Sequence, residues 1–393
     1  MRGFCSIFSQ LLQLFPRLEF EGAVKQHQAE YHARGFTSWG QFVALLFCQL
    51  GRAHSLREIC GGLASCEGKL KHLGIPQAPK RSTLAYANER RPWELFQTVF
   101  GQLLAKCQAL VAGQGGRKKF RFQNRLLSLD GTVIDLCVTL FDWAKFRRTK
   151  GAVKLHLLLD HDGYLPSFAV ITPGKTQELT VARQMRFDPG TVLVMDRGYI
   201  DYQWFVELTR QQVWFVTRMK DNAVYQVVEK REVPEKGPVL KDEVIFFARL
   251  AEPSEEYFFR RVEVWDAEKG QPIVFLTNHK GFGPTTIARI YKDRWQVELF
   301  FKALKQNLKI KTFVGTSANA VRTQIWTALI AMLVLRYLQL KATFGWSLSN
   351  LTALLRQQLF VYRDLDRWLN EPFEAPPALA GAHDAQLVLA LHG

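Results

Sequence analysis

Apolar residues recur at three- and four-residue spacing through the first part of the chain, which is the pattern of short amphipathic helices. Two such sets are Ile7, Leu11, Leu12 and Leu14, and then Phe42, Leu45, Leu46 and Leu50. Pro16, Gly35, Gly51 and the Gly61–Gly62 pair separate the segments. The pattern predicts a helical domain over residues 1–112, followed by a basic linker at 113–125, whose sequence is GQGGRKKFRFQNR from residue 113 onwards.

The pattern changes to apolar runs of strand length after residue 125. Strands are predicted at Leu126–Leu136, Val153–Asp160, Tyr164–Ile171, Thr191–Met195 and Val213–Thr217, with helices at Thr176–Met185 and Tyr202–Gln211. The tripeptide HDG between the second and third strands is a hairpin signal. This order predicts a mixed α/β sheet over residues 126–220 and excludes the regular βαβ alternation of a Rossmann fold.

The last third of the chain divides into three predicted parts. Residues 221–283 alternate like β-strands and are read as a β-rich insertion. Residues 284–345 predict one long helix from Pro284 to about Leu308 and a very apolar second helix from Ala318 to Ala342. Residues 346–393 form a helical tail, whose Pro- and Ala-rich end is expected to be loosely packed.

The chain has 393 residues, of which 48% are hydrophobic and 22% charged, which is typical of a globular protein. Only the net charge indicates a class of binding partner. The net charge is +16, and residues 1–120 contribute +9 of it through 16 lysines and arginines against seven glutamates. A protein this basic typically meets nucleic acid or an anionic surface. The helical part therefore suits a helix-turn-helix-type DNA reader, and a solvated helical bundle with excess lysine explains it equally well.

The six cysteines form no CxxC pair and are expected to be small buried residues of a reducing compartment. The longest apolar run, from Ile325 to Leu335, is shorter than a membrane span requires, and no secretory signal is recognised. We therefore expect a cytoplasmic protein that does not bind membranes.

Two aspartates follow apolar strand sequences and are candidate metal ligands. Asp130 is taken to end the first central strand, and Asp196 follows the strand that ends at Met195. Carboxylates at the rim of a sheet are suitable ligands for Mg²⁺. One aspartate after a strand is more often a turn or a helix cap, so the pair is more informative than either alone.

A third carboxylate comes from the helix predicted at residue 284. At 100° per residue, Tyr291, Arg294, Glu298 and Lys305 lie within about 60° of one another, beside the apolar stripe. A solvated charged face is the alternative, although it explains the shared tyrosine and arginine less well. Three carboxylates could hold two Mg²⁺ ions for an in-line displacement, while lysine and arginine hold neighbouring phosphates.

These residues resemble the catalytic blocks of DDE transposases from bacterial insertion sequences. The blocks are Asp130-Gly-Thr132, the sequence MDRGY from Met195, and Tyr291-(2)-Arg294-(3)-Glu298-(6)-Lys305, which matches the Y-(2)-R-(3)-E-(6)-K pattern of the insertion-sequence-four family without a gap. Residues 5–75 also resemble the N-terminal region of one branch of that family. The resemblance covers most of the chain.

The resemblance implies a ribonuclease-H-like catalytic core with Asp130, Asp196 and Glu298 as the acidic, metal-binding triad. It implies two Mg²⁺ ions, which Mn²⁺ could replace, and contacts from Tyr291, Arg294 and Lys305 to the DNA backbone. The implied reaction is cleavage at the element's inverted repeats and strand transfer into target DNA, by a homodimer in the synaptic complex. The protein would be cytoplasmic and associated with the nucleoid when bound to DNA.

Other residues carry weaker predictions. Related enzymes stack a tryptophan of the insertion on a displaced base, and Trp265 is the candidate, with packing between strands as the commoner alternative. Arg147 and Arg148 belong to a basic run that could contact the DNA backbone or form a solvated loop. His156, Asp160, His161 and Asp162 resemble a metal cluster, and a structural role in the hairpin is favoured.

Two other functions share the same residues. A ribonuclease-H-like nuclease would have the triad and cut DNA without joining ends. A catalytically silent DNA-binding protein derived from a transposase would be expected to lack one of the acids, and all three are present here. The sequence favours an active DNA transposase over both.

Overall fold

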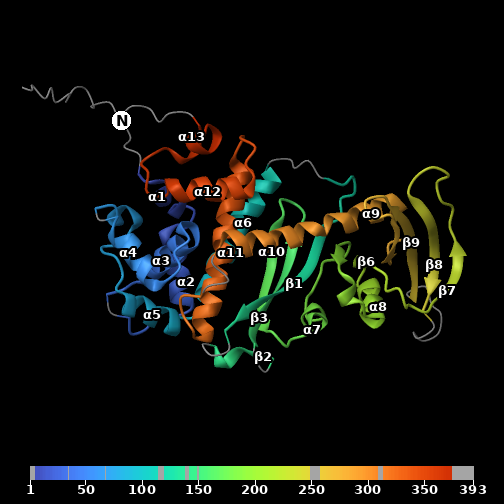
Figure 1. Ribbon diagram of the computed structural model, residues 1–393, viewed down its shortest axis with the longest axis horizontal. Coiled ribbons are helices and arrows are strands. Elements are labelled where there is room, and N and C mark those ends of the chain that lie inside the picture. Colours follow the sequence, from blue (N-terminus) through green and yellow to red (C-terminus); the bar gives the residue numbers. More distant parts are fainter. Residues whose placement is uncertain are drawn as a thin grey trace, which may run out of the picture.

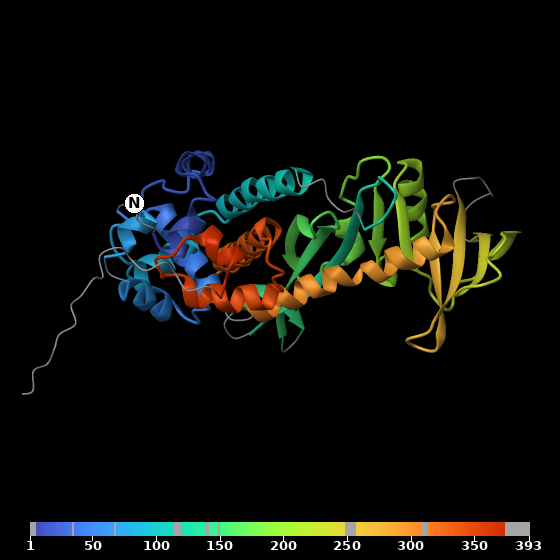
Figure 2. The same cartoon turned by 90° about the horizontal axis from the view of Figure 1, so that it is seen from above.

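The computed structural model describes residues 5–33, 35–66, 68–113, 119–137, 141–147, 150–247, 257–308 and 313–373. The molecule is elongated, with helices gathered at one end and one large twisted sheet at the other (Figures 1 and 2). The sequence-based expectation of a mixed α/β protein with a large sheet is confirmed. The Pro- and Ala-rich end, from residue 374, lies outside the described residues.

The first part of the chain is helical, as the apolar spacing predicts. Its elements are α1 (Ile7–Leu12), α2 (Arg17–Gln26), α3 (Ser38–Gly51), α4 (Leu56–Ala64), a 3₁₀ helix (Leu70–Leu73), α5 (Arg81–Arg90) and α6 (Glu94–Gly113). Several helices begin at a hydroxyl cap: Ser55 accepts a hydrogen bond from the backbone N–H of Glu58, and Thr37 accepts one from Gly40.

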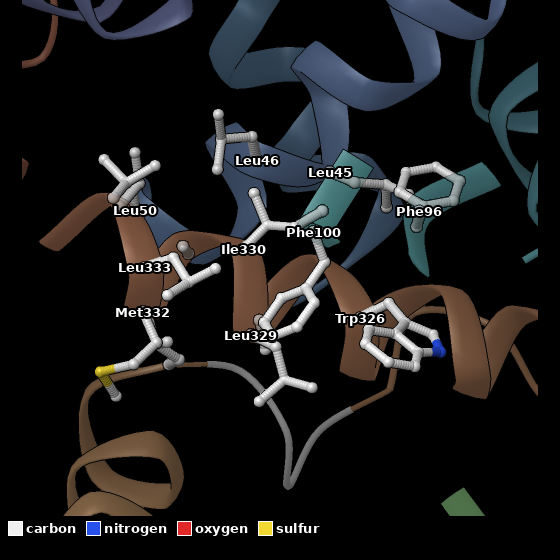
Figure 3. Close-up of a cluster of buried hydrophobic side chains, with 14 of the residues drawn as sticks. Leu45, Leu46, Leu50, Phe96, Phe100, Trp326, Leu329, Ile330, Met332 and Leu333 are labelled. Carbon is white, nitrogen blue, oxygen red and sulfur yellow. The ribbon is translucent and has the colours of Figure 1, made fainter. Parts of the chain in front are cut away.

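The core of this helical part is a helix from the other end of the sequence. Helix α11 (Ala318–Lys341) has an unbroken buried run over most of its length, and α12 (Leu348–Gln358) and α13 (Leu365–Asn370) follow it. Figure 3 shows Leu329, Ile330 and Leu333 of α11 facing Leu46 of α3 and Phe100 of α6. We call α1–α6 together with α11–α13 the helical region.

Two described helices, α6 and α11, are long and apolar enough to cross a membrane by length and composition alone. In α11, 83% of the relevant window is buried inside the protein. Helix α6 packs on α11 through Val99, Phe100 and Leu103, which are also buried. Helix α11 therefore fits the core of a helical bundle, where an apolar surface on all sides is expected, whereas α6, with 39% of its window buried, packs on the bundle through one face.

The rest of the chain is organised on one sheet. Its strands are β1 (Leu126–Leu136), β2 (Lys145–Arg147), β3 (Lys150–Asp160), β4 (Leu165–Pro173), β5 (Val192–Met195), β6 (Trp214–Arg218), β7 (Gln226–Lys230), β8 (Val239–Phe246), β9 (Phe258–Asp266) and β10 (Gln271–Thr277). Their order is β2-β3-β1-β5-β6-β10-β9-β8-β7, with β4 paired to β3. The strands of the β-rich segment after residue 221 therefore extend the central sheet.

Alternation along the central strands decides which helices cover each face of the sheet. Leu127 and Leu129 of β1 pack with α7 (Glu178–Ala182) and α8 (Tyr202–Arg210) in one apolar cluster. Leu126 of β1 packs with Ile287 and Ile290, which belong to α9 (Pro284–Asp293), in a second cluster. Helices α7 and α8 thus cover one face, and α9 covers the other. We call the sheet together with α7–α10 the sheet region.

The single helix predicted from Pro284 to Leu308 is wrong in one respect, because the structure has two helices. Helix α9 ends at Asp293 and α10 spans Trp295–Asn307, with a turn at Arg294. The backbone N–H of Arg294 bonds to the carbonyl of Tyr291 at 3.2 Å, which is three residues back, so the helix tightens and breaks there. The two helices still run along the sheet in one line (Figure 2).

The cysteines fit their expected state better than their expected burial. All six are free thiols, as predicted. Cys48 and Cys107 are buried, while Cys137 is exposed and the remaining three are half-buried. Burial was therefore correctly predicted for only two of them.

Candidate active site

Two neighbouring parallel strands bring Asp130 and Asp196 together. Strands β1 and β5 pair in the register Leu129↔Met195, so the next residue of each strand, an aspartate, stands in the same row. Asp130 lies on the same face of β1 as Leu126, and Asp196 continues the face of Val194 in β5. Leu126 and Val194 belong to the α9 cluster, so both aspartates face the α9–α10 side. The expectation that the first central strand ends at Asp130 is wrong. Strand β1 continues to Leu136 because β3 still pairs with it.

Burial and like charges act strongly on the first aspartate. Asp130 Oδ1 accepts a hydrogen bond from the backbone N–H of Gly131 at 2.8 Å, and its side chain is 16% exposed. The pKa of Asp130 is raised to about 7, chiefly by burial; the hydrogen bond from Gly131 and the charge of Arg294 act to lower it, while the negative charges of Asp196 and Glu298 act to raise it. The second aspartate is held by its own turn, since Asp196 Oδ1 accepts from the N–H of Gly198 at 2.8 Å.

Arg294 connects the third carboxylate to this pair. Its guanidinium forms one ion pair with Asp130 at 3.4 Å and another, shorter one with Glu298. The side chain of Arg294 is only 12% exposed, so both attractions act in a poorly solvated setting. The turn at Arg294 thus places a cation between the carboxylates of the sheet and that of α10.

The other two members of the same motif lie on either side of this arginine. Tyr291 is half-buried against Phe275 of β10, and the guanidinium of Arg294 lies 5.6 Å from the centre of its ring. Burial raises the pKa of Tyr291, so it is a neutral phenol at physiological pH. Lys305 of α10 donates to Thr132 Oγ1 at 2.6 Å and to the carbonyl of Val133 at 3.0 Å, which ties α10 to β1.

The donor set suits a hard divalent cation. Mg²⁺ prefers carboxylate oxygens, and Asp130, Asp196 and Glu298 supply them beside a buried position where uncompensated negative charge is costly. Arg294 supplies the compensating positive charge in this structure. Among the described residues no three acidic, histidine or cysteine side chains form a ready-made ligand group, and Glu298 is held in an ion pair with Arg294.

The structure does not add the weaker predicted residues to this cluster. Trp265 lies on β9 opposite Pro272 of β10 and is 45% exposed. The turn after it approaches α9, because Glu268 and Lys292 form an exposed ion pair at 2.7 Å. Arg147 lies in β2, and its side chain, like the whole of Arg148, lies outside what the structure describes.

A basic hollow beside Asp196 was not predicted as part of the site. It has a volume of about 550 Å³ and is lined by Arg197, Gly198, Lys220, Asp221 and Asn222. Arg218, two residues before Lys220, lies close enough to Tyr291 to lower its pKa. Arg197 belongs to the MDRGY block, which was the available signal, whereas the Arg218–Asn222 turn carries no motif.

The residues at the HDG hairpin have structural partners, in line with the structural role that the sequence favoured. His156 bonds to Thr172 Oγ1 at 2.9 Å, and burial lowers its pKa to about 4. Asp160 pairs with Arg125 at 2.8 Å and accepts from the N–H of Asp162. His161 turns away from them toward Ser128 and Asp293. The side chains of His156, Asp160 and His161 therefore each have a different partner.

Comparison with known proteins gives the same picture for most of the chain. Residues 121–334 match the family model described as "Transposase DDE domain", and residues 5–76 match a domain of unknown function, DUF4372. The chain is 32% identical to "Putative transposase y4zB" of Sinorhizobium fredii, over 83% of this chain and 89% of that protein. It is 29% identical to "Probable transposase for insertion sequence element IS5377" of Geobacillus stearothermophilus, over 70% and 72% of the two chains.

A solved structure, the piggyBac transposase synaptic complex with hairpin DNA, aligns with 94% of this chain and 82% of its own. The TM-score of 0.44 and the identity of 10% are too low for this likeness to support any argument about the site.

Proposed function

Since the chain belongs to the DDE transposase family and is a DNA transposase, an enzyme of metal-dependent DNA cleavage and strand transfer, we propose that Asp130, Asp196 and Glu298 are its catalytic acids. The observation that carries this proposal is the shared row of Asp130 and Asp196 on paired parallel strands, with Glu298 joined to Asp130 through Arg294. In this position three carboxylates from three separate segments converge on one face of the sheet.

The metal requirement of the family fits two Mg²⁺ ions at this cluster, with Mn²⁺ able to replace them. Asp130 and Asp196 would bind both ions, and Glu298 would complete the second position. When bound, the metal activates the attacking water or hydroxyl and stabilises the leaving oxygen. Arg294, released from Glu298, would then be free to hold a phosphate oxygen beside the cleaved bond.

The remaining motif residues are proposed to hold the DNA backbone. Tyr291 and Lys305 flank the acids along the α9–α10 line and can donate to phosphate oxygens. The basic hollow with Arg197 and Lys220 continues this surface past Asp196. Trp265, exposed on the hairpin that approaches α9, would stack on a displaced base, and Arg147 and Arg148 would contact phosphates further from the acids.

The helical region is proposed to recognise the inverted repeats at the ends of the element. Helix α5 supports this reading, because Lys80, Arg81 and Arg90 are all exposed and Tyr86 is 64% exposed on the same short helix. A basic helix with an accessible aromatic side chain is the kind of element that enters a DNA groove. The matched DUF4372 segment would then be part of an end-recognition domain.

Several finer features follow from the same proposal. The order β4-β3-β1-β5-β6, antiparallel up to β1 and parallel after it, supports a ribonuclease-H-like core with β7–β10 as an insertion. The domain boundaries would be those expected from the sequence, except that α11, expected in the second part of the core at 284–345, packs in the helical region. The working form would be a homodimer holding two ends and a target, located in the cytoplasm and at the nucleoid when bound to DNA.

The test uses the inverted repeats that should flank the gene. A labelled fragment carrying one repeat is incubated with the purified chain in Mg²⁺ or EDTA, beside Glu298→Gln and the control Asp135→Asn on the opposite face of β1. Metal-dependent cutting at the repeat boundary, lost only in Glu298→Gln, is the expected result. Specific binding without cutting would favour the silent DNA-binding alternative, and cutting without preference for the repeat would favour a general nuclease.

A further inference from the structure

Asp293, the residue before Arg294, is the centre of a buried polar network that the catalytic motif does not explain. Its side chain is 2% exposed and accepts hydrogen bonds from three side chains, two in the β3–β4 turn and one in the linker before β1. His161 Nδ1 lies 2.6 Å from Asp293 Oδ2, the Tyr164 hydroxyl lies at 3.3 Å, and the ammonium of Lys119 forms an ion pair. We call these residues and Ser128, described next, the Asp293 network.

The network reaches the strand of Asp130 through the same histidine. His161 Nε2 shares a hydrogen bond of 2.6 Å with Ser128 Oγ, and Ser128 lies two residues before Asp130 on the same face of β1. The donors around Asp293 lower the pKa of its carboxyl despite burial, so Asp293 is an anion and only accepts hydrogen bonds. His161 Nδ1 must therefore carry a hydrogen and donate a hydrogen bond to Asp293.

Serine, histidine and aspartate in this order also form the nucleophilic triad of many hydrolases. That reading fails here, because Ser128 has no solvent exposure at all and stands in the middle of a paired strand. A nucleophile must reach its substrate, and no substrate can reach Ser128 Oγ. The network can act only through the protein that surrounds it.

Its position indicates what it acts on. Asp293 is the last residue of α9, at the break where Arg294 turns toward Asp130 and Glu298. Fixing Asp293 to β1 and to the β3–β4 turn fixes the direction in which α10 leaves the break. We infer that the Asp293 network is a positioning device that sets Arg294 and Glu298 against Asp130, a role that rests on the proposed transposase chemistry.

Lys119 extends this device to the segment between the two regions. It belongs to the basic linker that joins α6 to β1, and its side chain is 53% exposed. The ion pair with Asp293 therefore connects the chain leaving the helical region directly to the start of α10.

The test separates DNA binding from cutting in the full-length chain. Asp293→Asn keeps the size of the side chain but cannot accept from three donors, and Ser128→Ala removes one oxygen without adding atoms. The matched control is Asp160→Asn, another buried aspartate at the end of β3, paired with Arg125 and not with the network. Single-turnover cutting of repeat DNA in Mg²⁺, the Kd for that DNA and the melting temperature are measured for each.

We expect Asp293→Asn to cut about 100-fold more slowly and Ser128→Ala about tenfold more slowly, because small misplacements of reacting groups cost this much. The Kd for DNA should stay within about threefold of wild type, and Asp160→Asn should cut normally. Combining Ser128→Ala with Asp293→Asn should cost no more than Asp293→Asn alone, since the two act through one network.

Wild-type cutting by Asp293→Asn would overturn the positioning role. Equal losses of DNA binding, melting temperature and cutting would also overturn it, and would assign the network to folding. If Asp293→Asn does not fold, Ser128→Ala decides by the same comparison. A wild-type chain that binds repeat DNA and never cuts it would overturn the proposed function itself, and with it this role.

Discussion

The helical region and the sheet region bury different kinds of side chain. Apart from Arg91 and Arg363, the buried polar groups described in the helical region are neutral, and α11 is surrounded by leucine, phenylalanine and tryptophan. The sheet region buries complete ion pairs instead. Arg260 and Asp242 are bonded at 2.6 and 2.8 Å with side chains only 2% and 3% exposed.

The buried charges of the sheet region hold the segments that carry the site. Arg260 also donates to the carbonyls of His279, Lys280 and Phe282, which form the loop that leads into α9. Asp293 holds the other end of α9. A buried ion pair adds little net stability, since desolvation offsets attraction, but it fixes geometry. Apolar burial therefore stabilises the helical region, whereas buried ion pairs in the sheet region hold the segments of the site in place.

The largest expected effect lies in the sheet region and concerns activity alone. Asp196→Asn should reduce cutting of repeat DNA by about 10³-fold, because metal-assisted charge stabilisation contributes several kcal/mol to the barrier. Binding of the same DNA should persist. Cutting rates and Kd are measured beside Asp135→Asn, whose side chain is exposed on β1. An equal loss of cutting in Asp196→Asn and Asp135→Asn would contradict a specific role of Asp196 in the site.

The next effect lies in the helical region and concerns stability. Leu329→Ala, at a fully buried position of α11, should lower the free energy of unfolding by about 2–5 kcal/mol through lost burial and a cavity. Leu18→Ala, at a position 83% exposed, is the control and should change stability little. Denaturant unfolding measures both. A stable Leu329→Ala would contradict the view that α11 is the core of this region.

The third prediction concerns the pH dependence of stability, which arises from two histidines of the sheet region. Burial lowers the pKa of His156 and His279 of the sheet region to about 4, so the folded state binds fewer protons than the unfolded state between pH 6.5 and 4. Stability is therefore present above pH 6.5 and is lost as pH falls toward 4, by about 2–3 kcal/mol for His156. His156→Gln should flatten denaturation midpoints measured across that window, while the contribution of His279 remains. An unchanged slope would contradict this assignment.

The smallest effect tests the helical region as a DNA reader. Arg81→Ala on α5 should weaken binding of repeat DNA by about 1 kcal/mol and reduce the slope of log K against log salt by about one, as for one lost phosphate contact. Cutting of DNA that is already bound should be unchanged. Binding titrations at several salt concentrations measure it, and a loss confined to cutting would move α5 out of the recognition surface.

Much of the fold was accessible from local pattern. The strand Leu126–Leu136 and the helix beginning at Ala318 match β1 and α11 almost residue for residue, because apolar spacing reports the local period directly. The break at Arg294 was not accessible. The helical wheel treats residues 284–308 as one rod, whereas Asp293 is drawn toward His161, which is 132 residues away in sequence.

The candidate site divides in the same way. The motif spacings predicted Asp130, Asp196 and Glu298 as one group, and their catalytic role stays a prediction. The basic hollow with Lys220 and the Asp293 network were missed as parts of the site, since each joins residues from turns and strands that carry no common motif. Asp293 lies off the stripe that Tyr291, Arg294 and Glu298 share, and that direction is what places it in the network.

The sequence by itself determined the helices and strands, the surplus of positive charge and the resemblance to DDE transposases, because each depends on residue type and local spacing. Only the tertiary structure decided that α11 fills a bundle begun more than 250 residues earlier, and that β7–β10 extend the central sheet. It alone decided that Asp293 links α9 to β1. Such features depend on which buried surfaces and polar groups meet, and no local pattern records that choice.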